Sequence, residues 1–231
     1  MRNPLNIIKS GKNFSGFFSL GRKWGSLFLI LAVLASLSGC QLVTTAVYMI
    51  KGTDVDPDCP VKLKGKIAVL CWTDPSQVYT DGDNANALGA AINHKLNQKL
   101  NKKKCEIVSQ QEVLNRLDNY SDNITDVDDL IEIAKELEVD YLIGVYLTEY
   151  EYQEGFNVFR GKAMVEVSLI DGKAGKEVYS KLDMPKYVYP PNRSVSTDDM
   201  SAQAFQRVYM SKLAEQVGRL FYKYDRYDVD M

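Results

Sequence analysis

Hydrophobic and polar positions recur with two different periods along most of this chain, and these periods predict alternating strands and helices. Residues 66–72, KIAVLCW, form a continuous apolar run, which is typical of a central strand covered on both faces. Residues 84–102 place apolar side chains three or four positions apart, as one face of a helix requires. A short strand is then predicted at 106–108, and two short helices begin near Ser109 and Thr125.

The rest of the pattern predicts a hairpin and a long final helix. Residues 141–152 begin as an apolar run and end in alternating glutamates and tyrosines, which indicates a strand that is buried over its first half only. Residues 159–169 alternate apolar and polar side chains, the period of a strand with one face in water. Residues 171–175 supply the turn and 177–184 the returning strand. The helix is predicted at about 198–224.

This order of elements predicts an α/β fold with a single mixed sheet of five strands. Right-handed crossovers give the strand order 2-1-3-4-5, a parallel core extended by an antiparallel hairpin. The first and last helices then cover one face of the sheet, and the middle pair covers the other. The domain is expected at 64–224, between a tether at 40–63 and a polar tail at 225–231. Only Gly82 follows the first strand, so no glycine-rich phosphate loop supports nucleotide binding.

Residues 1–39 have the features of a lipoprotein signal peptide. A basic segment without acidic residues precedes an apolar run of about twelve residues, which is too short for a permanent membrane span. The tetrapeptide LSGC at 37–40 resembles the lipobox of bacterial lipoproteins. That resemblance implies that Cys40 carries diacylglycerol and palmitate and becomes the first residue of the mature protein. An uncleaved N-terminal anchor is the alternative.

The same resemblance implies a location. Gln41, rather than Asp, follows Cys40, which favours sorting to the periplasmic face of the outer membrane, with retention at the inner membrane as the alternative. Removal of residues 1–39 takes away five of the 28 basic residues and none of the 30 acidic ones. The remaining negative charge argues against a nucleic-acid partner and leaves the acyl chains as the membrane attachment.

The cysteines beyond Cys40 allow at most one disulfide, because there are three of them: Cys59, Cys71 and Cys105. Cys71 and Cys105 are predicted at opposite ends of neighbouring parallel strands, which is too far for a bond. Cys59 and Cys105 remain the one possible disulfide, and buried free thiols are the favoured interpretation. No zinc-binding spacing is present.

Candidate catalytic groups are few, so we expect no catalytic residue, no metal and no cofactor. His94 is the only histidine and falls on the polar side of its helix, which excludes a nucleophile system built around it. Glu149 and Glu151 could serve a glycosidase, but alternation along a strand indicates a charged edge that blocks aggregation. Cys71 ends a central strand without a neighbouring base. An envelope hydrolase is kept as an alternative.

Binding is the function that the aromatic content favours. The chain has 14 tyrosines, and exposed tyrosine buries a large area at little entropic cost, although tyrosine also suits strands and half-buried helix edges. The surfaces favoured for contact with another envelope protein are the loop at 73–83 and the proline- and tyrosine-rich segment at 187–193. The residues selected within them are Asp74, Tyr79, Tyr187, Tyr189, Asn192 and Arg193.

Three stretches carry a wider resemblance. GKIAVLCW, IAKELEVDYLIGVYL and VEVSLIDGKAGKEVYS look like the periplasmic α/β module shared by CsgG, LpoB and the amino-terminal domain of TolB, over most of residues 64–222. The resemblance implies a non-enzymatic docking module. A CsgG-like oligomeric secretion component is the alternative, and it would need two inserted amphipathic hairpins. VYPPN and LAEQVGRLFYKYD further resemble a group of uncharacterised bacterial lipoproteins, which brings no activity with it.

Overall fold

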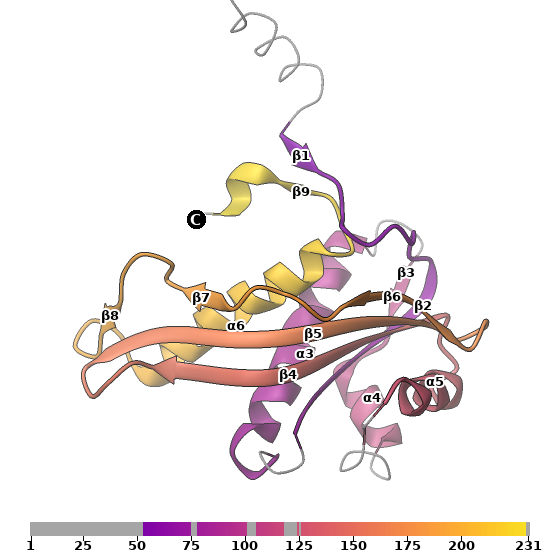
Figure 1. Ribbon diagram of the computed structural model, residues 1–231, viewed down its shortest axis with the longest axis horizontal. Helices are drawn as coiled ribbons and strands as arrows, with labels where there is room; N and C mark the ends of the chain where they lie inside the picture. The colour runs from indigo at the N-terminus through magenta and orange to yellow at the C-terminus, as the bar shows by residue number, and fades with distance from the viewer. Residues whose placement is uncertain (1–52, 75–77, 101–104, 118–123, 125, 230–231) are drawn as a thin grey trace, which may run out of the picture. The chain divides into compact units, whose positions relative to one another are not determined.

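A mixed β-sheet of seven strands forms the centre of the molecule (Figure 1). The computed structural model describes residues 53–74, 78–100, 105–117, 124 and 126–229. The predicted signal peptide and Cys40 lie outside these residues. The strands of the sheet are β2 (Gly65–Thr73), β3 (Cys105–Ile107), β4 (Tyr141–Gln153), β5 (Val158–Asp171), β6 (Lys176–Lys181), β7 (Tyr187–Tyr189) and β8 (Val195–Ser196).

The predicted order of the first five strands is confirmed, but the predicted number of strands is wrong. The order is β3-β2-β4-β5-β6, with β2 parallel to β3 and β4 and with β5 antiparallel to β4 and β6. β7 and β8 add two short antiparallel pairings to β5. Proline cannot donate a ladder hydrogen bond, so the prolines of this segment argue against a central strand but not against pairing at an edge. Tyr187–Tyr189 pair because they precede Pro190 and lie at the sheet edge.

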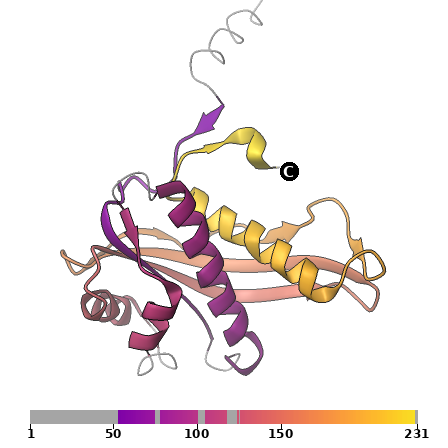
Figure 2. The same cartoon turned by 180° about the vertical axis from the view of Figure 1, so that it is seen from behind.

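Helices cover both faces of the sheet in the predicted arrangement. The four long enough to contribute are α3 (Val78–Leu100), α4 (Gln110–Arg116), α5 (Val127–Glu136) and α6 (Ala202–Arg219). α3 and α6 pack side by side on one face, in front of the sheet in Figure 2. α4 and α5 bury a smaller cluster on the other face. None of the helices in the described part of the chain is long and apolar enough to cross a bilayer.

Two helix starts differ from the sequence prediction. α3 begins at Val78, so the predicted loop at 73–83 is shorter than expected and contributes a turn and a half to the helix. α6 begins after Ser201, whose Oγ accepts a hydrogen bond from the amide of Ala204 at 3.3 Å. Ser196, which precedes the predicted helix start at about 198 and could have capped it, belongs to β8 and pairs with Val158 instead.

The β4–β5 hairpin is longer than the layer of helices on its α4 and α5 side. Where the start of β4 pairs with the end of β5, both faces of the hairpin are buried. Leu142 and Ile170 there contribute to the core under α4 and α5. Farther out, only the α3 and α6 side is covered, and Met164 on the opposite side is 40% exposed. The longest candidate for an inserted hairpin, 146–169, therefore forms ordinary strands of this sheet.

The first and last described segments pair with each other. β1 (Asp54–Val55) and β9 (Tyr224–Asp225) form a two-stranded antiparallel sheet, followed by the short helix η3 (Arg226–Val229). Cys59 is buried, and its amide donates to the carbonyl of Leu220 at 2.9 Å. The end of the expected tether therefore packs on the domain, and the start of the expected tail pairs with β1.

Candidate functional site

The described residues enclose a groove between helix α6 and the segment that follows β6. Its volume is about 540 Å3. One wall is Tyr187–Arg193, which contains β7 and two prolines; we name this segment the arm and the space beside it the arm groove. The other wall consists of polar side chains of α6, namely Lys212, Glu215, Gln216 and Arg219.

Strand β5 fixes the position of the arm. β7 pairs with it in antiparallel register, which places Tyr189 opposite Gly161. Nη2 of Arg160, also on β5, donates to the carbonyl oxygen of Pro191 at 3.4 Å. Beyond the arm, β8 returns to pair with the first two residues of β5. Because both ends of the arm are held by the same strand, the wall of the groove is a fixed part of the sheet edge.

Stacked aromatic rings join the arm to α6. Tyr209 of α6 is fully buried, and the rings of Tyr187 and Tyr189 lie on it at centroid distances of 6.2 and 6.5 Å. A Cβ atom at position 161 would lie 2.5 Å from the Tyr209 ring, so glycine is needed where this ring covers β5. Tyr187 and Tyr189 are therefore half-buried parts of the core rather than the exposed tyrosines expected of a contact surface.

On the α6 side of the groove, Arg219 and Glu215 form an ion pair that is largely shielded from water. The side chain of Arg219 is only 8% exposed, and its Nη2 lies 2.7 Å from Oε1 of Glu215. Its guanidinium also lies 4.7 Å from the centre of the Tyr224 ring, which suits a cation–π contact. Nζ of Lys95, on α3, is 3.7 Å from the other oxygen of Glu215. Both carboxylate oxygens of Glu215 thus face a cation.

The phenol of Tyr187 stays protonated at neutral pH. Burial raises the pKa of Tyr187 to about 12, and the nearby Tyr189 and Glu215 act in the same direction, against an opposing effect of Arg219. A protonated phenol can donate a hydrogen bond to an anionic ligand. It cannot act as a general base at this pH.

The arm groove brings together most of the residues that the sequence selected for partner contact. Those that line it are Tyr187, Tyr189, Asn192 and Arg193. Asp74 does not join them, because it follows β2, and β4 and β5 lie between β2 and β7. Tyr79 belongs to the first turn of α3, and its side chain is outside the described residues.

The helix wall was missed by the sequence analysis. The sequence analysis predicted the helix at about 198–224 but selected none of its polar residues as contact residues. Residues 212, 215, 216 and 219 are separated by three, one and three positions, a spacing that places them on one helix face. That face holds three charged residues, and the spacing could have identified it.

The groups considered for catalysis lie apart from the arm groove. His94 is exposed on α3, with its Nε2 2.8 Å from Nε2 of Gln98. Complete burial raises the pKa of the Cys71 thiol, which keeps it protonated. Glu149 forms an ion pair with Lys186. Within the described residues, no group of three or more His, Cys, Asp or Glu side chains is placed to hold a metal ion.

Cys59 and Cys105 are both buried thiols in this structure. Sγ of Cys105 lies 3.3 Å from the carbonyl oxygen of Leu63, and Sγ of Cys59 lies 3.9 Å from that of Val61. No disulfide joins these two cysteines in this structure.

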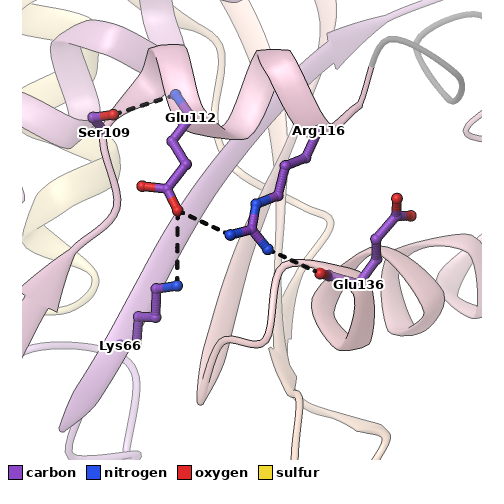
Figure 3. Close-up of polar contacts among 5 residues, drawn as sticks. All are labelled: Lys66, Ser109, Glu112, Arg116 and Glu136. Carbon is purple, nitrogen blue, oxygen red and sulfur yellow. Dashed lines mark hydrogen bonds and ion pairs between the residues drawn. The ribbon is translucent and has the colours of Figure 1, made fainter.

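A polar cluster on the opposite side of the molecule has a structural explanation (Figure 3). Oγ of Ser109 accepts a hydrogen bond from the amide of Glu112 and so caps α4. Oε1 of Glu112 lies 3.3 Å from Nη2 of Arg116 and 3.8 Å from Nζ of Lys66. Nη1 of Arg116 donates to the carbonyl oxygen of Glu136 at 3.3 Å. These contacts join α4 to the last turn of α5.

Comparisons with known proteins give a likeness to solved structures only. No protein-family model matches the chain, and no curated protein matches it. The PelC dodecamer from Paraburkholderia phytofirmans is 14% identical with a TM-score of 0.41, over 73% of this chain and 95% of that chain. Lipoprotein GNA1162 from Neisseria meningitidis is 12% identical with a TM-score of 0.34, over 67% of this chain and 98% of that chain.

LpoB, one of the proteins that the sequence motifs resemble, is also among these structures. The LpoB C-terminal domain from Escherichia coli is 16% identical with a TM-score of 0.27, over 56% of this chain and 84% of that chain. The resemblance to CsgG and to TolB stays a prediction from the sequence.

Proposed function

We propose that this chain is a lipid-anchored docking module of the cell envelope, which binds another envelope protein through the arm groove and catalyses no reaction. The observation that carries the proposal is the groove itself. Four residues selected from the sequence as contact residues line one concave site, although none was selected for its position in space. Residues that share a rigid wall can bind a partner without a cost of ordering the site.

The chemistry of the groove favours binding over catalysis. Its lining residues include neither a histidine nor a cysteine. Both oxygens of the Glu215 carboxylate are engaged in ion pairs, one with Arg219 and the other with Lys95. Tyr187 stays protonated. No pair of lining side chains therefore combines a nucleophile with a base.

The sequence supports the membrane attachment. The lipobox-like LSGC predicts acylation at Cys40, and Gln41 after it favours the periplasmic face of the outer membrane. We propose that the acyl chains hold the domain at that membrane. The partner is then a protein of the same compartment, and the loss of affinity caused by a small interface is offset by the high local concentration at the surface.

A photo-crosslinking experiment tests the docking proposal. A photoreactive phenylalanine analogue replaces Asn192, which is exposed at the groove, in the full-length acylated protein, and intact cells are irradiated. We expect an adduct with one envelope protein. The control carries the analogue at Lys176, exposed where β6 begins opposite Asp171. Positions 161 and 171 on β5 are about 33 Å apart at the usual strand rise, so this probe lies far from the groove.

Three outcomes would contradict the proposal. Equal adducts at both positions indicate random collision, and no adduct at position 192 indicates that the groove has no protein partner. Turnover by the purified protein in a broad screen of envelope substrates would favour the hydrolase alternative instead.

A further inference from the structure

The arm groove carries positive charge in a protein whose net charge is negative. The whole chain has a formal charge of −2, yet the groove is lined by three cations and one anion. The cations are Arg193, Lys212 and Arg219, and the anion is Glu215. A cleft lined by one sign of charge attracts ligands of the opposite sign.

The carboxylate of Glu215 does not neutralise the positive charge that a ligand in the groove would meet. Glu215 Oε1 lies 2.7 Å from Nη2 of Arg219, and Oε2 lies 3.7 Å from Nζ of Lys95. Lys95 belongs to α3, so the carboxylate is compensated from outside the groove as well as from inside. Two cations therefore contact the one carboxylate of the groove, and the groove is also lined by Arg193 and Lys212. A basic ligand would have to compete with Arg219 and Lys95 for it.

The other lining groups are apolar or aromatic. Tyr187, Val188 and Tyr189 are followed by Pro190 and Pro191, so most of the arm wall presents ring and aliphatic surface. Such surface binds apolar side chains, whereas the helix wall binds charge. A ligand that matches both walls has a carboxylate next to an apolar group.

The dimensions favour a peptide over a small anion. The volume of about 540 Å3 is within the range of about 300–1,000 Å3 that holds sizeable organic ligands, and a phosphate or carboxylate alone would leave most of it empty. The arm wall has seven residues, of which Tyr187–Tyr189 are extended in β7 and the next three bend. A short peptide can lie along this wall.

A lipid surface fits less well. Recognition of anionic lipid headgroups uses clusters of about four to eight Lys and Arg residues. Here the groove has three, separated by aromatic and proline side chains and accompanied by a glutamate. The arrangement suits one or two carboxylates rather than an array of phosphates.

We propose that the arm groove binds an acidic peptide segment of the partner, in which an aspartate or glutamate stands next to an aromatic or aliphatic residue. This inference rests on the proposed docking function. Arg193, at the exposed rim, contacts the carboxylate first, since its planar guanidinium matches two carboxylate oxygens. The arm holds the neighbouring apolar side chain.

Fluorescence anisotropy on the full-length acylated protein in detergent micelles tests this. The probes are three labelled heptapeptides that alternate phenylalanine or leucine with glutamate, with glutamine or with lysine. We expect the glutamate peptide to bind at least tenfold more tightly than the other two, and its affinity to fall as salt rises, because its charges are screened.

Charge reversal identifies the site. Arg193→Glu should weaken binding of the glutamate peptide at least tenfold and favour the lysine peptide. Lys176→Glu, the same change at the far end of β5, should leave both affinities unchanged. Circular dichroism on both variants checks that the fold is retained.

Several results would overturn the inference. These are equal affinity for the glutamate and glutamine peptides, no binding of any peptide, or competition by vesicles containing phosphatidylglycerol, which would assign the groove to lipid. The crosslinking experiment separates the two proposals. An adduct at position 192 without binding of acidic peptides refutes only the ligand class, whereas a missing adduct refutes the docking function.

Discussion

Single residues determine how closely the arm, the sheet and α6 can pack against one another. Gly161 is the clearest case, because a side chain there would meet the ring of Tyr209. It also lies directly opposite Tyr189 in the β5–β7 pairing. A hydrogen at this position lets three aromatic rings pack over the backbone of one strand.

Gly161→Ala should therefore destabilise the protein. The added methyl group is forced against Tyr209, and overpacking of this kind costs about 1–3 kcal/mol. Urea denaturation measures the free energy of unfolding, with Ser168→Ala on the other face of β5 as the control. In a Tyr209→Ala background the same change should cost much less, since the clash is gone. Equal costs in both backgrounds would show that the ring does not determine the residue at 161.

Asp140 plays a comparable role where the central strands begin. Its Oδ2 accepts a hydrogen bond from the amide of Lys66 at 2.7 Å, and its carboxylate pairs with Lys173. Gly65 has φ of +77°, and a Cβ there would collide with the Asp140 carboxylate. Glycine and aspartate are thus required together at this point.

Acid should weaken this contact. The hydrogen bond from Lys173 and then that from the Lys66 amide lower the pKa of Asp140 from its usual value of about 3.8. A carboxyl whose folded pKa is lowered stabilises the fold above its unfolded pKa and loses that contribution as the pH falls through the folded pKa. We expect stability to fall below about pH 4, and Asp140→Asn to reduce that pH dependence. An unchanged profile between pH 2 and 5 in chemical denaturation would contradict this.

At the scale of whole elements, local patterns predicted the strands better than the ends of the helices. The apolar run at 66–72 and the turn at 171–175 fixed the central strand and the hairpin, because both signals are local. Ser196 and Ser201 are equally good caps in sequence, and only the pairing of Ser196 with Val158 decides between them. That pairing joins segments far apart in the chain.

The outer half of β4 is an edge that is protected in several ways. Among the described strands, β2 pairs with β4 only as far as Leu147, and β5 alone accompanies the rest. Register shifts at Leu147/Glu149 and Glu151/Gln153 bend this part of the strand. Two glutamates occupy it, which agrees with the interpretation of a charged edge. Bulges and charges both oppose pairing with a second molecule.

Removal of one charge should make this edge more prone to pair with a second molecule. Glu151→Ile leaves an exposed, β-branched apolar residue on an unpaired strand, and we expect the protein to associate with increasing concentration. Light scattering after size exclusion measures the association. Glu132→Ile, the same change at an exposed position of α5, is the control. Monomeric Glu151→Ile at the concentrations where the wild type is monomeric would rule out a protective role.

For the whole molecule, the sequence predicted one wall of the arm groove, the arm itself, but not the wall formed by α6. The arm was selected because its tyrosines and prolines are close together in the sequence. Its opposite wall is assembled from α6, and the contact of Lys95 with Glu215 joins two helices far apart in sequence. The spacing of its polar residues marks one face of α6, but the position of that face opposite the arm and the contact with Lys95 follow only from the packing. The tyrosines were also expected to be exposed, and only the packing on Tyr209 shows that they belong to the core.

The anchoring that we propose for the protein depends on one atom, the sulfur of Cys40. Cys40→Ser should abolish incorporation of labelled palmitate and move the protein from the membrane to the soluble fraction of the periplasm. Cys59→Ser, which removes a buried thiol of the domain, should keep the label. A Cys40→Ser protein that still sediments with membranes would favour the uncleaved anchor.

The pairing of β1 with β9 has a practical consequence for labelling. Asp54 lies opposite Asp225, so the carboxyl-terminal end of the domain emerges beside the point where the polypeptide enters it. A bulky fusion joined after η3 would lie close to β1 and could disturb its pairing with β9. Fluorophores and affinity tags are better inserted in the turn between β4 and β5, where Phe156 is 96% exposed.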